Sequence, residues 1–230
     1  MKQYNVAIVD TVNAIQNNQY MRMLDRKTGV TRDKWMDFGV DIYCFLDDLK
    51  ARGIEIILVL GYEGSGKSYG IKTLNPETTK WFHADNKPPT FKGGLSGYFE
   101  NKDLTKPKAN YQVPKTYSDI ITWIDKGREK GVVSSNLKVF ILGHIEDFRT
   151  ADGEMRQRLK VLGNMATKMN IEGSVTHCYY TEVQKMGDKL EFKLRTQNSG
   201  FNTGRSPDEM FADTYIPNDF QLILDAIEKY

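Results

Sequence analysis

Residues 61–68 read GYEGSGKS and match the pattern G-x-x-x-x-G-K-[ST] in full. They directly follow the apolar run 54–60 (IEIILVL), which is typical of a buried strand. In this pattern the glycines let backbone N–H groups approach phosphate oxygens. A strand that enters such a turn, with residues 69–74 continuing as the first turns of a helix, predicts an α/β fold built around a phosphate-binding loop.

The side chains of the loop predict its ligands. Lys67 is expected to reach the β- and γ-phosphates of a nucleotide, and Ser68 to ligate Mg²⁺. ATP and Mg²⁺ are therefore the predicted ligands, and no guanine-reading motif favours GTP. The residues expected to contact the nucleotide are Gly61, Tyr62, Glu63, Gly64, Ser65, Gly66, Lys67, Ser68 and Tyr69. The alternative is a glycine-rich turn that holds no ligand.

Length and composition predict an ordinary soluble protein. With 230 residues, 40% apolar and 27% charged, the chain is expected to form one domain over residues 1–230. A net charge of +2 predicts no general polyanion-binding surface. Cys44 and Cys178 lie in apolar segments, are expected to be buried, and match no disulfide or metal spacing. Together with the lack of a signal-peptide pattern or a long apolar stretch, this predicts a cytoplasmic protein without a membrane partner.

Asp10 is a candidate metal ligand. Residues 4–9 (YNVAIV) form a short apolar run that ends at Asp10 and Thr11. A carboxylate at the C-terminal end of a buried strand can hold Mg²⁺ through water, as the Walker B aspartate does. Many buried strands end in aspartate only because of turn chemistry, so the pattern alone leaves both interpretations open.

Hydrophobic periodicity predicts the other elements. Helices are expected at about 35–49, 117–131, 155–169 and 218–230, and strands at 81–84, 138–143, 174–181 and 189–195. The alternating residues 189–195 (KLEFKLR) are typical of a half-buried antiparallel strand that pairs with the strand before it.

Three further side chains are candidates for catalysis. The strand 138–143 runs into His144 and Glu146, where open α/β sheets place ligands, so these residues are expected to sense the γ-phosphate or orient water. A helix cap and a turn histidine are the alternative. Arg205 lies in the polar loop 196–207 and has the chemistry of an arginine finger, or of an ordinary surface arginine.

The segment 90–114 is a long insertion without clear periodicity. Its lysines and aromatic rings have the chemistry for single-stranded nucleic acid, cations for phosphates and rings for stacking on bases. A solvated loop is the alternative. The side chains concerned are Lys92, Lys102, Lys106, Lys108, Tyr98, Phe99 and Tyr111.

In this order, the features resemble the RecA-like branch of P-loop ATPases, and within it the phage-encoded annealing and recombination ATPases of the Sak type. The resemblance covers most of residues 55–217. It implies a RecA-like, mostly parallel sheet flanked by helices, with a C-terminal antiparallel hairpin. The segments that carry it are GYEGSGKS, WFHAD, ILGHIED, the expected helix around 159–169, YYTEV, KLEFKLRTQ and Arg205-Ser206-Pro207.

The resemblance also assigns roles to carboxylates. Asp85 stands where the family has the carboxylate that activates water, one methylene shorter than the glutamate of RecA itself. Gly143 stands where the Mg²⁺-holding aspartate of Walker B belongs, whereas IVDT at 8–11 looks like that strand. We therefore predict a circularly rearranged core, in which the strand bearing Asp10 lies near the phosphate loop and VFILGHIE is the sensor strand.

The function implied is that of an ATP-hydrolysing, phage-encoded protein that acts on single-stranded DNA in recombination, annealing or replication, in the host cytoplasm. A homo-oligomer is expected, with nucleotide between neighbours and Arg205 acting in trans. Two other classes stay open, a small-molecule or nucleotide kinase and a nucleotide-switch assembly ATPase without DNA. The absence of arginine between Tyr69 and Ile124 disfavours the arginine-rich lid of such kinases.

Overall fold

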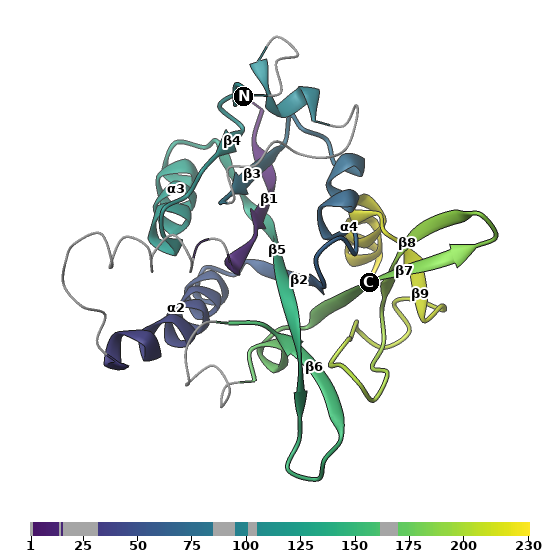
Figure 1. The fold of residues 1–230 in the computed structure, drawn as a ribbon. Coiled ribbons are helices and arrows are strands. Elements are labelled where there is room, and N and C mark those ends of the chain that lie inside the picture. The colour runs from purple at the N-terminus through teal and green to yellow at the C-terminus, as the bar shows by residue number, and fades with distance from the viewer. Residues whose placement is uncertain (1, 14, 16–31, 85–94, 101–104, 162–169) are drawn as a thin grey trace.

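A mostly parallel sheet forms the centre of the protein (Figure 1). The computed structural model describes residues 2–13, 15, 32–84, 95–100, 105–161 and 170–230. Within these ranges the strands are β1 (Tyr4–Asp10), β2 (Glu55–Gly61), β3 (Thr79–His83), β4 (Tyr111–Gln112), β5 (Val133–Arg149), β6 (Met155–Leu159), β7 (His177–Met186), β8 (Lys189–Arg195) and β9 (Tyr215–Pro217).

The strands lie in the order β4-β3-β1-β5-β2-β7-β8-β9, and β6 pairs with β5 outside this path. From β4 to β7 every pairing is parallel. β6, β8 and β9 pair antiparallel with their neighbours. The predictions of a mostly parallel α/β sheet and of a C-terminal antiparallel hairpin are confirmed.

Helices cover both faces of the sheet (Figure 1). On one face lie α2 (Arg32–Ala51) and α3 (Tyr117–Glu129); on the other lie α4 (Phe220–Lys229) and the 3-10 helix η1 (Lys67–Thr73). Two short 3-10 helices, η2 (Ser96–Tyr98) and η5 (Glu172–Ser174), complete the described elements. The strand β1 is buried on both faces because its alternate residues, such as Ala7 and Ile8, enter the two separate cores.

The prediction of a helix at 155–169 is wrong for residues 155–159, because Met155–Leu159 is the strand β6. β5 does not stop at Gly143 but runs on to Arg149, turns through Gly153 in a positive-φ conformation, and pairs with β6 as a hairpin. The apolar spacing of Met155 and Leu159 fits a helix as well as a strand, and pairing with β5 decides between them. Residues 162–169 lie outside the described residues.

The three described rings named in the segment 90–114 are buried, which contradicts their predicted role as a stacking surface. Tyr98, Phe99 and Tyr111 are at most 8% exposed, and Tyr98 and Tyr111 pack edge-on against Trp81 of β3. They belong to the core because β4 extends the sheet beside β3. Among the lysines of this segment, Lys106 is exposed and Lys108 is half-buried, whereas Lys92 and Lys102 lie outside the described residues.

The two cysteines differ in their surroundings. Cys178 is buried as predicted, whereas Cys44 is exposed on α2, which contradicts the prediction for that residue. Its neighbours Phe45 and Leu46 face the core, so the apolar run around Cys44 belongs to one side of a helix. Among the described residues, no helix combines the length and apolar character that crossing a membrane requires.

Lys80 on β3 gives a pH-dependent prediction. Its side chain is buried, donates a hydrogen bond from Nζ to the Ala109 carbonyl oxygen (2.6 Å), and lies near the rings of Phe82 and Trp123. Burial lowers the pKa of Lys80 to about 8. Above this pKa the folded chain has released a proton that the unfolded chain still binds, so the free energy of unfolding rises with pH.

Between pH 8 and 10 we expect Lys80 to add up to about 3 kcal/mol to the free energy of unfolding. Urea titrations across this window measure the gain. Lys80→Met should flatten the pH dependence, whereas Lys130→Met, at an exposed lysine on the surface, should leave it unchanged. An equal slope in the parent chain and in Lys80→Met would contradict the prediction.

Candidate functional site

The loop that follows β2 has the backbone its sequence pattern demands. Gly64 and Gly66 have φ angles of 76° and 89°, a region that favours glycine. A Cβ atom at Gly66 would collide with the ring of Phe192, and one at Gly61 with the side chains of Thr181 and Ser65. Glycine is therefore required by packing at 61, and by both packing and backbone conformation at 66.

Lys67 is folded into this loop. Its Nζ donates hydrogen bonds to the carbonyl oxygens of Gly61 (3.0 Å) and Tyr62 (2.7 Å), and the residue is only 6% exposed. The hydroxyl of Ser65 donates to the Tyr62 carbonyl oxygen as well (2.7 Å) and contacts that of Thr181. The ammonium group is thus held at the inner side of the loop.

Ser68 and Asp10 lie in direct contact. The Ser68 hydroxyl donates to Asp10 Oδ2 at 3.0 Å, although the two residues are 58 positions apart in the chain. β5 separates β1 from β2, and the C-terminal ends of the three parallel strands meet at one edge. Asp10 is 2% exposed. The prediction that the strand bearing Asp10 lies near the phosphate loop is confirmed.

His83 adjoins Asp10 and was not predicted as a site residue. It stands opposite Asp10 in the pairing of β3 with β1, and its Nδ1 lies 3.1 Å from the Asp10 carbonyl oxygen and 3.8 Å from Oδ2. The ring stacks on Trp81. A histidine at the C-terminal end of a strand was visible in the sequence, but not that this strand is the neighbour of β1.

Tyr111 is a further neighbour of this acidic group. Burial, and then the charge of Asp10, raise the pKa of Tyr111 to about 12. The phenol therefore stays protonated beside Asp10 at neutral pH.

His144 and Glu146 lie within β5 and not in a turn after it, which corrects their predicted setting. His144 stands opposite Gly61 in the pairing of β2 with β5, and its backbone N–H donates to Asn13 Oδ1 (2.8 Å). Glu146 forms an ion pair with Arg158 of β6 (Nε to Oε1, 2.8 Å). His144 is thus brought to the start of the loop, whereas the carboxylate of Glu146 is engaged within the β5–β6 hairpin.

Arg205 is tied to its own chain. Its backbone exchanges two hydrogen bonds with Cys178, which pairs in turn with Leu58 of β2. The half-buried side chain places Nε 3.5 Å from the Thr203 carbonyl oxygen. Its predicted action on a neighbour's nucleotide stays a prediction. Asp85 lies outside the described residues.

Tyr62 connects the loop to the β5–β6 hairpin. Its hydroxyl contacts Asp147 Oδ1 on β5 and accepts a hydrogen bond from Gln157 Nε2 on β6 (3.1 Å). Burial, and then the hydrogen bond to Asp147, raise the pKa of Tyr62. The hairpin is therefore attached to the loop through one phenol group.

We expect Tyr62→Phe to lower the free energy of unfolding by about 1 kcal/mol, because the charge-assisted contact with Asp147 is lost. Urea unfolding followed by circular dichroism measures the change. Tyr69→Phe is the matched control, since its hydroxyl makes no hydrogen bond to a described residue. Equal stability of the Tyr62→Phe variant and the parent chain would show that this contact contributes nothing in solution.

Comparison with known proteins assigns no relative. No protein-family model, no curated protein and no solved structure matches this chain. The described residues also contain no group of three or more histidine, cysteine, aspartate or glutamate side chains placed to hold a metal ion. The functional conclusion therefore depends on the geometry of the loop and its neighbours.

Proposed function

We propose that the chain binds ATP with Mg²⁺ at residues 61–68 and hydrolyses the β–γ phosphoanhydride bond. The observation that carries this proposal is the 3.0 Å contact between Ser68 and Asp10, beside an ammonium group held inside the loop. A turn that merely connects β2 to η1 needs neither a buried lysine nor a carboxylate from a distant strand. A lysine and a carboxylate placed in this way are the groups that a nucleoside triphosphate with a divalent cation requires.

The donor set fits Mg²⁺. This ion takes oxygen ligands and usually keeps several waters, with one or two protein groups and substrate phosphates as the other ligands. Ser68 and Asp10 supply two such oxygens, and a larger protein cluster is not needed where phosphates complete the shell. When bound there, Mg²⁺ would neutralise negative charge on the β- and γ-phosphates.

The residues of the chain have distinct parts in the proposed reaction. Lys67 would exchange the carbonyl oxygens of Gly61 and Tyr62 for phosphate oxygens, and η1 would present backbone N–H groups. His83 would hold Asp10 in place from β3. Two carboxylates, Asp85 and Glu146, are predicted to activate water. Because Glu146 is paired with Arg158, we favour Asp85, two residues after His83, for this role.

We further propose that the protein is a RecA-like ATPase of the Sak type that acts on single-stranded DNA as a homo-oligomer. Support comes from the order of the sheet, in which only β5 separates β1, the strand that bears Asp10, from β2, the strand that leads into the loop. The rearranged core requires this proximity. The β5–β6 hairpin offers exposed Arg149 and Arg156, the latter paired with Glu154, and exposed Lys160 follows it. These cations could contact phosphates in place of the buried Tyr98, Phe99 and Tyr111. The alternatives are a kinase and a nucleotide-switch ATPase without DNA.

Titration of the chain with a fluorescent ATP analogue, with and without Mg²⁺, tests the proposal directly. We expect saturable binding that Mg²⁺ strengthens, and phosphate release that single-stranded DNA stimulates. DNA stimulation should weaken as salt rises, because phosphate contacts release counterions. Transfer of phosphate to a small acceptor would favour the kinase. Hydrolysis that does not change when DNA is added would favour the nucleotide-switch ATPase. Absence of nucleotide binding would overturn the proposal.

A further inference from the structure

The β7–β8 hairpin extends away from the body of the sheet (Figure 1) and carries apolar residues that are exposed to solvent. Leu190 is 66% exposed, Met186 59% and Val183 43%. They are three of the eight large hydrophobic residues that are exposed in the described part of the chain. Leu190 pairs with Lys185 and Met186 pairs with Lys189, so Val183 and Leu190 lie on one face of the hairpin and Met186 on the other. Exposed apolar side chains on both faces at the end of a hairpin suit a segment that inserts end-on into a partner. We call residues 183–190 the hairpin tip.

The hairpin tip is also cationic. Lys185 and Lys189 are both exposed, and neither forms an ion pair with a described residue. Asp188 in the turn offsets only one of these two charges. The hairpin tip therefore combines an apolar surface with a net positive charge.

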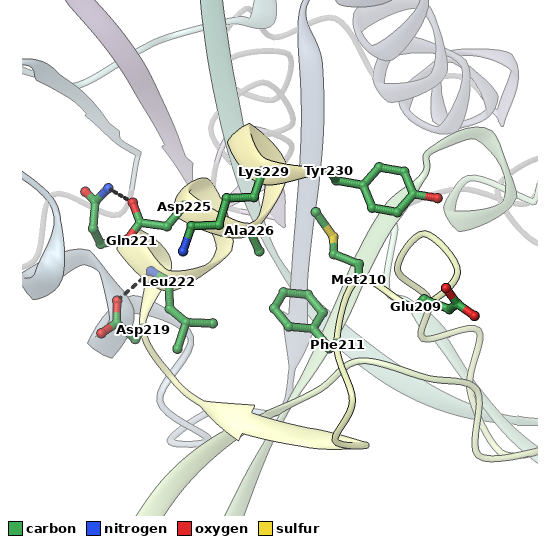
Figure 2. A pocket seen from close by; sticks show the side chains of 10 residues that line it. All are labelled: Glu209, Met210, Phe211, Asp219, Gln221, Leu222, Asp225, Ala226, Lys229 and Tyr230. Atoms are coloured by element: carbon green, nitrogen blue, oxygen red, sulfur yellow. Dashed lines mark hydrogen bonds between the residues drawn. The ribbon is translucent and has the colours of Figure 1, made fainter.

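A pocket of about 630 Å³ lies between α4 and the segment 209–211 (Figure 2). Apolar and polar side chains both line it, and Figure 2 shows the apolar Phe211 and Met210 facing Leu222 and Ala226 across the opening. Tyr230 lies at the rim. We call this cavity the α4 pocket.

The rim of the α4 pocket is acidic. Glu209, Asp219 and Asp225 line it, with Lys229 as the only cation among the lining residues. Glu209, Asp225 and Lys229 are exposed to solvent. Sites for small molecules place their polar groups inside an enclosed cavity, so this rim of exposed charges is better suited to a protein surface.

We propose that the hairpin tip of one copy of this chain docks in the α4 pocket of a second copy. Inserted end-on, the tip would bring its apolar side chains against Phe211, Met210 and Leu222 of the pocket. The two lysines, one on each face of the hairpin, would then lie beside the acidic rim. Complementarity of charge favours this pairing over contacts between two tips or two pockets. The occupant of the pocket is thus a second copy of the same protein.

Both surfaces are connected to the phosphate loop. At the base of the hairpin, the ring of Phe192 packs against Tyr69 (centroids 4.9 Å apart) and against Gly66. Just before α4, Asn218 Nδ2 donates to the Gly66 carbonyl oxygen at 2.7 Å. Docking would therefore act on the loop from either partner. This consequence rests on the proposed function, whereas the docking itself does not.

Sedimentation velocity of the full chain without nucleotide tests the docking. We expect concentration-dependent assembly, and a dissociation constant at least about 10-fold larger in the double variant Met186→Glu/Leu190→Glu. Met155→Glu is the matched control, an exposed methionine (41%) on the other hairpin, and should assemble as the parent chain does. A monomer at every concentration, or undiminished assembly of the double variant, would overturn the proposal.

Charge reversal identifies the two surfaces. Lys185→Glu/Lys189→Glu and Glu209→Lys/Asp225→Lys, all at exposed positions, should each weaken assembly, and an equimolar mixture of the two double variants should restore it. Restoration supports docking of tip into pocket, and failure to restore it overturns the pairing. Melting curves confirm that each variant is folded.

Nucleotide titration of the same samples separates the two proposals. Assembly without nucleotide binding contradicts the proposed nucleotide site and leaves the docking intact. Binding without assembly contradicts the docking and the proposed homo-oligomer, and leaves the nucleotide site intact.

Discussion

Replacing Asp10 by asparagine will reduce ATP hydrolysis by about 100-fold or more and change nucleotide affinity by no more than about a few-fold. The substitution keeps the size of the side chain and its contact with Ser68, but removes the charge that would face Mg²⁺. Phosphate release at saturating ATP measures the first quantity, and titration with a fluorescent analogue the second.

Asp47→Asn is the control for this change, because Asp47 is an exposed carboxylate on α2 remote from the loop. Its hydrolysis should equal that of the parent chain. An Asp10→Asn enzyme with full activity would show that the carboxylate of β1 takes no part in the reaction. The candidate metal site and the rearranged core would then both lose their support.

Lys67→Met is expected to weaken ATP binding by roughly 10- to 100-fold, since a charge-assisted hydrogen bond contributes about 1.5–3 kcal/mol. Methionine keeps the apolar part of the side chain in its buried position, so the loss reports mainly on the ammonium group. The rise in melting temperature on adding ATP and Mg²⁺ measures the effect, because a ligand of the folded state stabilises it by a free energy that grows with the logarithm of its affinity.

Lys72→Met tests whether the effect is specific to the loop. Lys72 lies on the same 3-10 helix, is exposed, and places Nζ 3.3 Å from the centre of the Tyr69 ring. We expect its ATP-dependent shift to match that of the parent chain. Equal shifts in the Lys67→Met and Lys72→Met variants would mean that ATP binds elsewhere.

The elements that could be predicted from the sequence have strong local signals. The strand predicted at 54–60 is β2, at 55–61, before a glycine-rich turn. Residues 117–129 form an amphipathic helix, and 189–195 an alternating strand. The closeness of Asp10 to Ser68 could also be predicted, because parallel strands bring their C-terminal ends to one edge whatever their order in the chain.

The features that could not be predicted depend on distant neighbours. Met155–Leu159 is a strand only because β5 continues beyond the sheet and offers it an edge. Tyr98 and Tyr111 are buried only because Trp81 of β3 lies against them, which composition does not reveal. His83 belongs to the site only because it pairs with Asp10, a contact across 73 positions of the chain that its local sequence does not reveal.

The position of β1 in the sheet has a consequence for synthesis. β1 leaves the ribosome before both of its sheet partners, which are β3 and the part of β5 near Leu142. At about 5–20 residues per second, the apolar residues of β1 wait on the order of ten seconds for both neighbours. The candidate metal ligand Asp10 is therefore synthesised well before the strands that position it. The nascent chain has to keep β1 from aggregating until β5 emerges.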